Sequence, residues 1–281
     1  MNSFFEMFSY QFIVYALIVG ISISICSALL GTSLVLKKNS MIGDGLSHVA
    51  FGACAIALAL NWAPLAFSIP VVIIASFLIL KLSERSKIHG DSAIALIASA
   101  SLAIGYIVIH VSGTNVDVEK YLYGSIFGIT TAEMILSVCL SFVVILVFVL
   151  LYNRIFSITF DETFMRSTNN KTGIYNMIIS VLCSITVVLG MKLMGALLIT
   201  SLIIFPTISA RQIFKTYKSV VISSAIISVV CFFIGIVINY YIDLPIGSTI
   251  VVVNLAAFIL FAGISFIKNH THFFKKIKNI L

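Results

Sequence analysis

Residues 41–48 have the sequence Met-Ile-Gly-Asp-Gly-Leu-Ser-His and open an apolar run that extends to residue 61. Small side chains dominate this run, which holds Gly43, Gly45, Ser47, Ala50, Gly52, Ala53, Ala55 and Ala57. Because small residues let helix backbones approach closely within lipid, the run predicts a central membrane helix packed by its neighbours. A helix at the lipid-facing rim is instead expected to carry large apolar residues on all sides, as residues 140–151 do.

Asp44 and His48 lie four residues apart in this run, so on a helix both side chains project from one face. An ionisable group in a bilayer costs about 2.5–3.5 kcal/mol on insertion scales and usually faces protein or a wet cavity. A carboxylate beside an imidazole supplies half of a coordination shell for a small divalent cation. The spacing also fits an Asp–His hydrogen bond that ties two helices together, and it leaves both interpretations open.

The composition indicates an integral membrane protein. The chain has 281 residues, of which 60% are hydrophobic and 10% charged, with a mean hydropathy of +1.17. Soluble domains carry about 25% charged residues. No Gly-x-x-x-x-Gly-Lys-Ser/Thr phosphate loop occurs, which excludes nucleotide hydrolysis by that route.

Apolar runs long enough to be candidate spans recur along the whole chain, at residues 12–36, 41–61, 63–82, 92–112, 131–152, 174–190, 193–210, 219–241 and 246–267. Only Met191 and Lys192 separate the sixth run from the seventh, so these two runs could form one broken traverse. The sequence therefore predicts an all-α, polytopic membrane bundle of eight or nine transmembrane helices that forms a single domain over residues 1–281.

Basic residues predict the orientation of the chain, because loops on the cytoplasmic side carry an excess of Lys and Arg. With the N-terminus outside and nine alternating spans, only Lys120 and Lys192 of the 17 basic residues remain outside. We therefore expect a multi-pass plasma-membrane protein with its C-terminus in the cytoplasm. The net charge of +7 is scattered over short loops, which indicates topology signals and no nucleic-acid partner.

Other candidate ligands are weaker. The cysteines lie in apolar runs without a Cys-x-x-Cys pair and are expected to be small buried hydrophobic residues: Cys26, Cys54, Cys139, Cys183 and Cys231. His270 and His272 form a His-Thr-His sequence on a basic tail, where solvated side chains are commoner than metal ligands. Glu133, near the outer end of the fifth run, is a candidate gate or dimer contact.

Two connections stand apart from the apolar runs. Residues 115–128 contain Tyr121 and Tyr123, which suit the headgroup level and predict a short interfacial helix outside. Residues 153–173 form the longest polar stretch on the predicted cytoplasmic side. Within it, a short helix is expected to begin near Asp161, where acidic residues favour the N-terminal end of the helix dipole. This stretch is either a solvated loop or a contact site for a cytoplasmic partner.

Pro206 lies inside the seventh run, together with Thr200 and Ser201. A helical proline frees a backbone carbonyl one turn earlier, here near Leu202. Such a carbonyl persists in a membrane only within protein or beside a wet cavity. The pattern predicts a kinked helix that either lines a pathway beside the second span or is bent for structural reasons alone.

At these residues the chain resembles the metal-importing ABC transporter permeases of bacteria. The segment Leu34-Val-Leu-Lys-Lys-Asn-Ser-Met-Ile-Gly-Asp-Gly-Leu-Ser-His48 is similar to the motif that opens the second helix in that family. The similarity continues through Glu119-Lys-Tyr-Leu-Tyr-Gly-Ser-Ile126, Phe160-Asp-Glu162 and Gly195-Ala-Leu-Leu-Ile-Thr-Ser201 to Pro206. The outer Gly-Ser-Ile and the Phe-Asp-Glu sequences resemble the zinc branch more than the manganese branch.

The resemblance implies a homodimeric permease with cytoplasmic ATP-binding subunits and an extracellular metal-binding lipoprotein. It implies that Asp44 and His48 coordinate the travelling cation. It also implies that residues 160–173 form the coupling helix that docks on the ATPase, with Phe160, Asp161, Glu162, Arg166 and Asn169 as its contact residues. The family usually has Gly where Asn169 stands, and Asn tolerates the left-handed conformation better than other non-glycine residues.

The expected function is therefore that of a non-enzymatic permease subunit that imports zinc by alternating access, with the metal as cargo and no resident cofactor. Manganese or ferrous iron is the alternative cargo, since Asp and His bind several first-row cations. A passive cation channel, which needs no ATPase, is the alternative from another class. An intramembrane hydrolase is disfavoured because the chain lacks both His-Glu-x-x-His and Gly-x-Ser-x-Gly.

Overall fold

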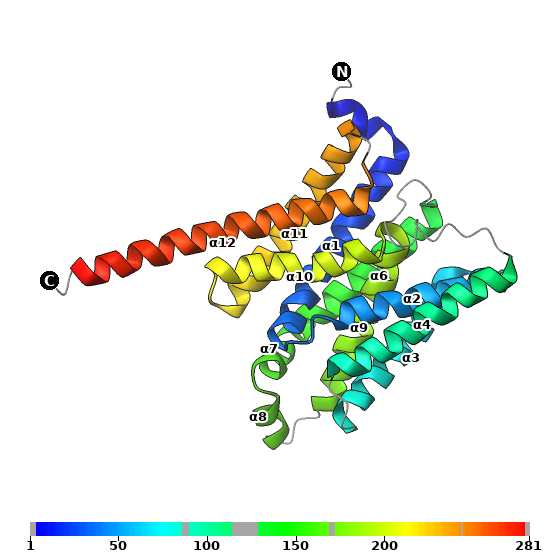
Figure 1. Cartoon of the computed structure of the whole chain (residues 1–281), viewed down its shortest axis with the longest axis horizontal. Coiled ribbons are helices and arrows are strands. Elements are labelled where there is room, and N and C mark those ends of the chain that lie inside the picture. Colours follow the sequence, from blue (N-terminus) through cyan, green and yellow to red (C-terminus); the bar gives the residue numbers. More distant parts are fainter. Residues whose placement is uncertain (1–3, 86–89, 114–128, 169–171, 243, 279–281) are drawn as a thin grey trace.

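The computed structural model describes residues 4–85, 90–113, 129–168, 172–242 and 244–278, with side chains except at 4, 5, 83–85, 193 and 269–278. All regular structure in these ranges is helical, which confirms the predicted class (Figure 1). Nine of the described helices are long and apolar enough to cross a membrane: α1 (Gln11–Leu36), α2 (Ile42–Ala59), α3 (Pro64–Arg85), α4 (Gly90–Ser112), α6 (Thr131–Leu150), α9 (Thr172–Met194), α10 (Ala196–Ile213), α11 (Tyr217–Ile242) and α12 (Ile246–Lys278). Within the described ranges the short helices are η1 (Phe4–Ser9), α7 (Tyr152–Phe160) and α8 (Glu162–Ser167).

The sixth and seventh apolar runs form two separate helices, α9 and α10, which run in different directions in Figure 1. Gly195 alone joins them, with a φ of 92° that lies in the region favoured by glycine. Its amide donates to the carbonyl of Met191 at 3.0 Å, and its carbonyl accepts from the amide of Ile199 at 3.3 Å. Gly195 thus closes one helix and opens the next.

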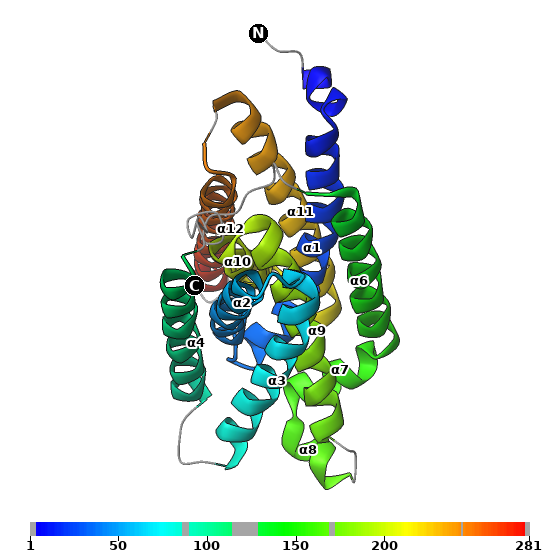
Figure 2. The same ribbon diagram turned by 90° about the vertical axis from the view of Figure 1, so that its right-hand side faces the viewer.

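The bundle has a buried centre and an exposed rim. Two thirds (67%) of the apolar window is buried in each of α1, α2 and α9, against 17% in α4, 22% in α6 and 11% in α12. The last helix, α12, projects away from the body in Figure 1, and Figure 2 shows α2 surrounded by its neighbours. The predicted central position of the second span is therefore confirmed.

Glycines of α2 allow the close packing that the sequence predicted. A Cβ atom built on Gly52 would lie 2.5 Å from the backbone oxygen of Ser101 in α4. On the other side of the bundle centre, hydroxyl hydrogen bonds join α1 to α11, as is common between membrane helices. These bonds are Ser228 to the Ser24 carbonyl at 3.1 Å, Thr32 with Ser224 at 3.1 Å and Ser33 with Tyr217 at 2.9 Å.

The helix α6 carries the exposed face that residues 140–151 predicted. Its outward side chains include Phe142, Val149 and Leu150, which are 63%, 61% and 72% exposed. The expectation that every cysteine is buried is wrong for Cys139, because it lies three residues before Phe142 and so on the same exposed face. The other four cysteines are buried.

Candidate metal site

The first turns of α2 position Asp44 and His48 between two neighbouring helices. A Cβ atom on Gly43 would lie 2.7 Å from the side chain of Ile203 in α10, and one on Gly45 would collide with Ile94 in α4. Because successive helix residues are rotated by about 100°, Asp44 points between the α10 side and the α4 side. His48, one turn later, lies on the same stripe.

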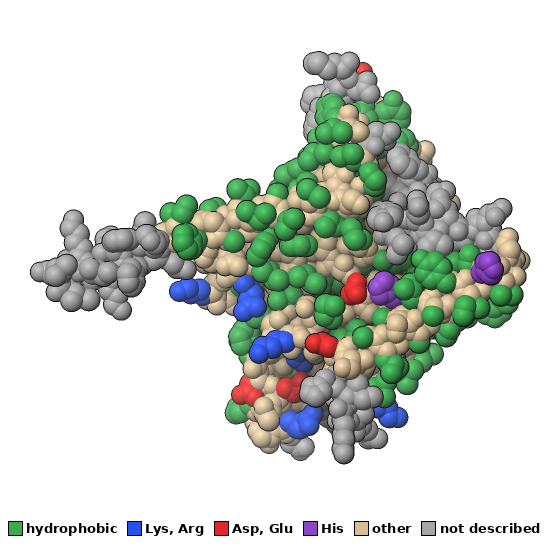
Figure 3. Space-filling model, in the orientation of Figure 1, with side chains coloured by type: hydrophobic (Ala, Val, Ile, Leu, Met, Phe, Trp, Pro, Cys, Tyr) green, Lys and Arg blue, Asp and Glu red, His purple; other side chains and the backbone are tan. Residues whose placement is uncertain are grey.

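The two side chains form a loose pair. His48 Nε2 lies 3.7 Å from Asp44 Oδ2, beyond hydrogen-bonding distance, and the side chains are 28% and 44% exposed. No group in the described part of the chain hydrogen-bonds to the buried Nδ1 of His48. On the face seen in Figure 3, an acidic and a histidine side chain lie next to each other close to hydrophobic side chains, while other acidic side chains lie near Lys and Arg. The structure thus brings the predicted pair together on one face, without the tight hydrogen bond of the alternative interpretation.

The described part of one chain supplies an incomplete ligand set. Among the described residues, no three side chains of His, Cys, Asp or Glu gather closely enough to hold a metal ion. A closed zinc site has four ligands. Asp44 and His48 are thus at most half of such a site, and the carboxylate and the imidazole are both partly exposed to solvent.

The predicted cytoplasmic helix begins where the sequence indicated. The Asp161 side chain accepts from the amide of Phe164 at 2.8 Å and caps α8, which runs from Glu162 to Ser167. Phe160 and Phe164 are 59% and 63% exposed. The segment α7–α8 therefore presents aromatic side chains on its surface, while Asn169 lies outside the described residues.

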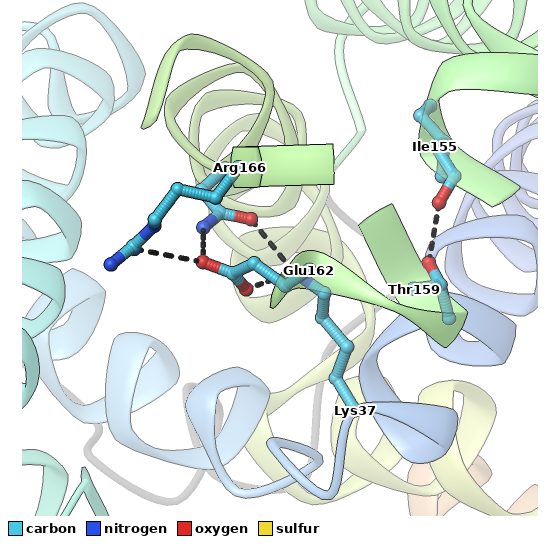
Figure 4. A network of polar contacts seen from close by, with 6 residues as sticks. Lys37, Ile155, Thr159, Glu162 and Arg166 are labelled. Carbon is cyan, nitrogen blue, oxygen red and sulfur yellow. Dashed lines mark hydrogen bonds and ion pairs between the residues drawn. The ribbon is translucent and has the colours of Figure 1, made fainter. Parts of the chain in front are cut away.

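Glu162 contacts two residues that the sequence did not single out, Lys37 and Asn176. Lys37 Nζ lies 3.3 Å from Glu162 Oε2 (Figure 4). Asn176 Nδ2 donates to Glu162 Oε1 at 3.1 Å. Arg166 also pairs with Glu162, at 3.4 Å across one turn of α8. From the sequence alone, Lys37 serves only to predict the orientation of the chain. The sequence signal for Asn176 is an amide side chain within an apolar run.

Pro206 is buried inside α10, and the helix continues past it to Ile213. The Ile203 side chain of the same helix faces Gly43 of α2. The expected neighbourhood of the seventh run and the second span is therefore confirmed. The contribution of Pro206 to a pathway stays a prediction.

The other residues that the sequence singled out lie away from the Asp44–His48 pair or outside the described side chains. Glu133 forms an ion pair with Lys192 of α9 and completes a capping box with Thr130 at the start of α6. Both interactions stabilise the N-terminal end of α6. The side chains of His270 and His272, and the whole of residues 115–128, lie outside the described parts.

Relatives of this chain carry names from metal transport. The probable iron transport system membrane protein of Haemophilus influenzae is 30% identical over 257 residues, covering 91% of this chain and 90% of that protein. The manganese import system permease protein ScaB of Streptococcus parasanguinis is 27% identical over 251 residues, with coverages of 89% and 90%. The high-affinity zinc uptake system membrane protein ZnuB of Haemophilus influenzae is 26% identical over 246 residues, with coverages of 87% and 94%.

The fold and the family also agree. A chain of PsaBC from Streptococcus pneumoniae, solved in complex with Fab, superposes with a TM-score of 0.83 and 24% identity over 92% of this chain and 95% of that one. The sequence pattern of the ABC 3 transport family matches residues 9–265, which is most of the chain. The resemblance found in the motifs is thus confirmed at the level of the family: the chain belongs to the ABC 3 transport family.

Proposed function

We propose that this chain is the membrane-spanning permease subunit of an ATP-driven importer of a divalent transition-metal ion, with zinc as the first candidate cargo. The observation that carries the proposal is the Asp44–His48 pair, an unclosed and partly exposed carboxylate–imidazole site on α2, one of the three helices with the largest buried share. Relatives named for manganese, iron and zinc transport support the class of cargo. The preference for zinc depends on the Gly-Ser-Ile and Phe-Asp-Glu sequences alone.

The pair suits transport because it is incomplete. A hydrated cation must exchange water for protein ligands to cross, and a carboxylate with a neutral imidazole replaces part of its shell. Binding must also be weak enough for release. In a homodimer with two-fold symmetry, the same face of a second copy would add another Asp and another His. Four side chains would then be available to coordinate the ion.

The partners follow from the same proposal. ATP-binding subunits in the cytoplasm would contact the exposed aromatic surface of Phe160 and Phe164 on α7–α8. An extracellular metal-binding lipoprotein would deliver the ion to the opposite side of the membrane. The distribution of basic residues supports an orientation with the N-terminus outside and the C-terminus in the cytoplasm.

Vesicles test this proposal directly. The chain is reconstituted with its ATP-binding subunits and its lipoprotein, with ATP and a zinc-sensitive dye sealed inside and Zn²⁺ supplied outside. We expect zinc to accumulate only with hydrolysable ATP. Accumulation that is equal without ATP would instead indicate a passive channel, and accumulation of Mn²⁺ or Fe²⁺ in place of Zn²⁺ would reassign the cargo. A complex that hydrolyses ATP without moving any of the three ions would contradict the proposal.

A further inference from the structure

Three side chains from distant parts of the sequence form a closed polar triangle at the predicted cytoplasmic end of the bundle. The ammonium group of Lys37 donates to Asn176 Oδ1 at 2.7 Å and to Glu162 Oε2 at 3.3 Å. The amide of Asn176 donates to the other carboxylate oxygen of Glu162 at 3.1 Å. The triangle joins the end of α1, the start of α8 and the second turn of α9 (Figure 4).

This triangle is shielded more than an ordinary surface ion pair. The side chain of Lys37 is only 13% exposed and that of Glu162 is 36% exposed, whereas Arg166, the other cation beside Glu162, is 67% exposed. Asn176 is 8% exposed. A charge withdrawn from water needs partners, so Lys37 is held to Glu162 and Asn176 more firmly than an exposed lysine would be. Arg166 adds little, because exposed pairs one turn apart are weak.

Lys37 is also tied to the turn that precedes Asp44. The Lys37 amide donates to the Ser33 carbonyl at 3.0 Å, and the Asn39 amide donates to the Leu34 carbonyl at 2.9 Å. The Ile42 amide then donates to the Asn39 carbonyl at 3.2 Å, which joins the turn to the first residue of α2. The connection from α1 to α2 is therefore short and hydrogen-bonded at both ends, so a displacement of Lys37 reaches α2 with little slack.

A small cavity lies against the triangle. Its volume is about 160 Å³, and its lining includes Lys37, Asn39, Glu162, Asn176 and Ser180. The space is large enough for several water molecules, and polar groups face it from several elements. The cavity, whose lining also includes Leu34, Ile42, Leu80 and Ile179, leaves the triangle room to shift on one side.

We propose that Lys37 is a positioning residue that links the α7–α8 segment to the metal-bearing end of α2. A partner that moves α8 pulls on Glu162, the ammonium group of Lys37 follows, and the first turn of α2 with Asp44 is displaced. The inference rests on the proposed function. It adds a named route by which a movement driven by ATP hydrolysis in the cytoplasmic subunits is transmitted to the cation ligands. A purely structural clamp would stabilise the bundle without setting how much metal moves per ATP.

The test measures zinc uptake and ATP hydrolysis separately in the reconstituted complex. For Lys37→Met we expect continued hydrolysis and a fall of about tenfold in zinc moved per ATP, as coupling free energies between sites typically allow. The charge swap Lys37→Glu with Glu162→Lys should recover a large part of that ratio. Lys38→Asn is the matched control, because it removes the same charge at the next, exposed position, where φ is 60° and Asn is well tolerated.

The outcomes separate the two proposals. If Lys37→Met moves as much zinc per ATP as the unaltered complex, or if the charge swap is no better than either single change, the linking role is wrong while the importer stands. If Lys37→Met does not assemble, the isosteric Glu162→Gln replaces it, and an unchanged ratio there overturns the inference equally. An unaltered complex that moves no zinc, manganese or iron overturns the proposed function and the inference with it.

Discussion

The two polar clusters of this bundle, the Asp44–His48 pair and the Lys37–Glu162–Asn176 triangle, are built in opposite ways. In the pair the nearest polar side-chain atoms, His48 Nε2 and Asp44 Oδ2, are 3.7 Å apart, and a buried ring nitrogen lacks a hydrogen-bond partner among the described residues. In the triangle every side chain contacts both of the others, at 2.7–3.3 Å. The pair thus keeps its oxygen and nitrogen atoms apart from each other, whereas the members of the triangle hydrogen-bond to one another, with Arg166 as a further partner of Glu162.

This difference fits the two roles proposed above, metal binding for the pair and mechanical linkage for the triangle. A buried polar atom without a hydrogen-bond partner costs free energy, unless a ligand or water binds to it. Because of this cost, such atoms are rare in proteins and are often found where they have a functional role. A satisfied network instead holds its elements in one arrangement. The comparison therefore predicts that changes in the pair affect transport without affecting stability, and that changes in the triangle affect both.

The largest effect is expected at the pair. Asp44→Ala or His48→Ala should lower zinc uptake at least about a hundredfold, since even the loss of an outer hydrogen-bond partner of a metal ligand costs about 10–100-fold. The thermal unfolding midpoint of the purified protein should not fall. Uptake into the vesicles and thermal unfolding in detergent are measured on the same preparations.

His110→Ala is the control for His48→Ala, because His110 is an exposed histidine in the last turn of the neighbouring α4. It should leave uptake unchanged. Full uptake in both the Asp44 and the His48 variants would remove the site assignment, and an equal loss in the His110 variant would show that the effect is not specific to the pair.

A second effect comes from moving α2 itself. Gly52→Val places a Cβ atom 2.5 Å from the Ser101 carbonyl, a backbone atom that cannot rotate away. The helices must separate, and overpacking of this kind costs about 1–3 kcal/mol. Thermal unfolding should show this loss, with lowered uptake because the pair is displaced. Gly263→Ala in α12 is the control, since no atom lies within 4 Å of the added Cβ, and a lower stability in that variant would contradict the packing argument.

The sequence predicted the pair far better than the triangle. Asp44 and His48 are four residues apart, so helix periodicity alone places them on one face. Lys37 and Glu162 are 125 residues apart in the chain, and their contact depends on how the end of α1, the start of α8 and α9 come together. Periodicity contains no information on such a contact, and the count of basic residues assigned Lys37 only to the cytoplasmic side.

The same limit explains two smaller outcomes. Gly195 showed that the sixth and seventh runs are separate helices, because its φ of 92° allows a break that hydropathy alone left open. Cys139 was expected to be buried because its neighbours are apolar, but lipid-facing helices are apolar as well. Hydropathy thus identified the spans without giving the side of each span that faces protein.

A third effect tests the stability half of the comparison. Lys37→Met removes one member of the triangle and leaves the Glu162 carboxylate with less compensation, which should cost about 1–2 kcal/mol, reduced by the partial exposure of Glu162. The thermal unfolding midpoint should fall, whereas that of His48→Ala should not. If both midpoints fall equally, the triangle and the pair do not differ in the way proposed here.

The smallest effect is expected at the cap of α8. Asp161→Ala removes the side-chain acceptor of the Phe164 amide, a bond of 2.8 Å, and loss of such a cap costs about 1 kcal/mol. Because the change loosens α8 at its first turn, where Glu162 is located, we expect a small drop in zinc moved per ATP that adds nothing further in a Lys37→Met background. Asp161→Asn is the matched control, since Asn caps nearly as well and should restore the ratio. A drop of equal size in Asp161→Asn would show that the carboxylate charge, and not the cap, is what the segment uses, and that α8 can loosen without disturbing the link to Asp44.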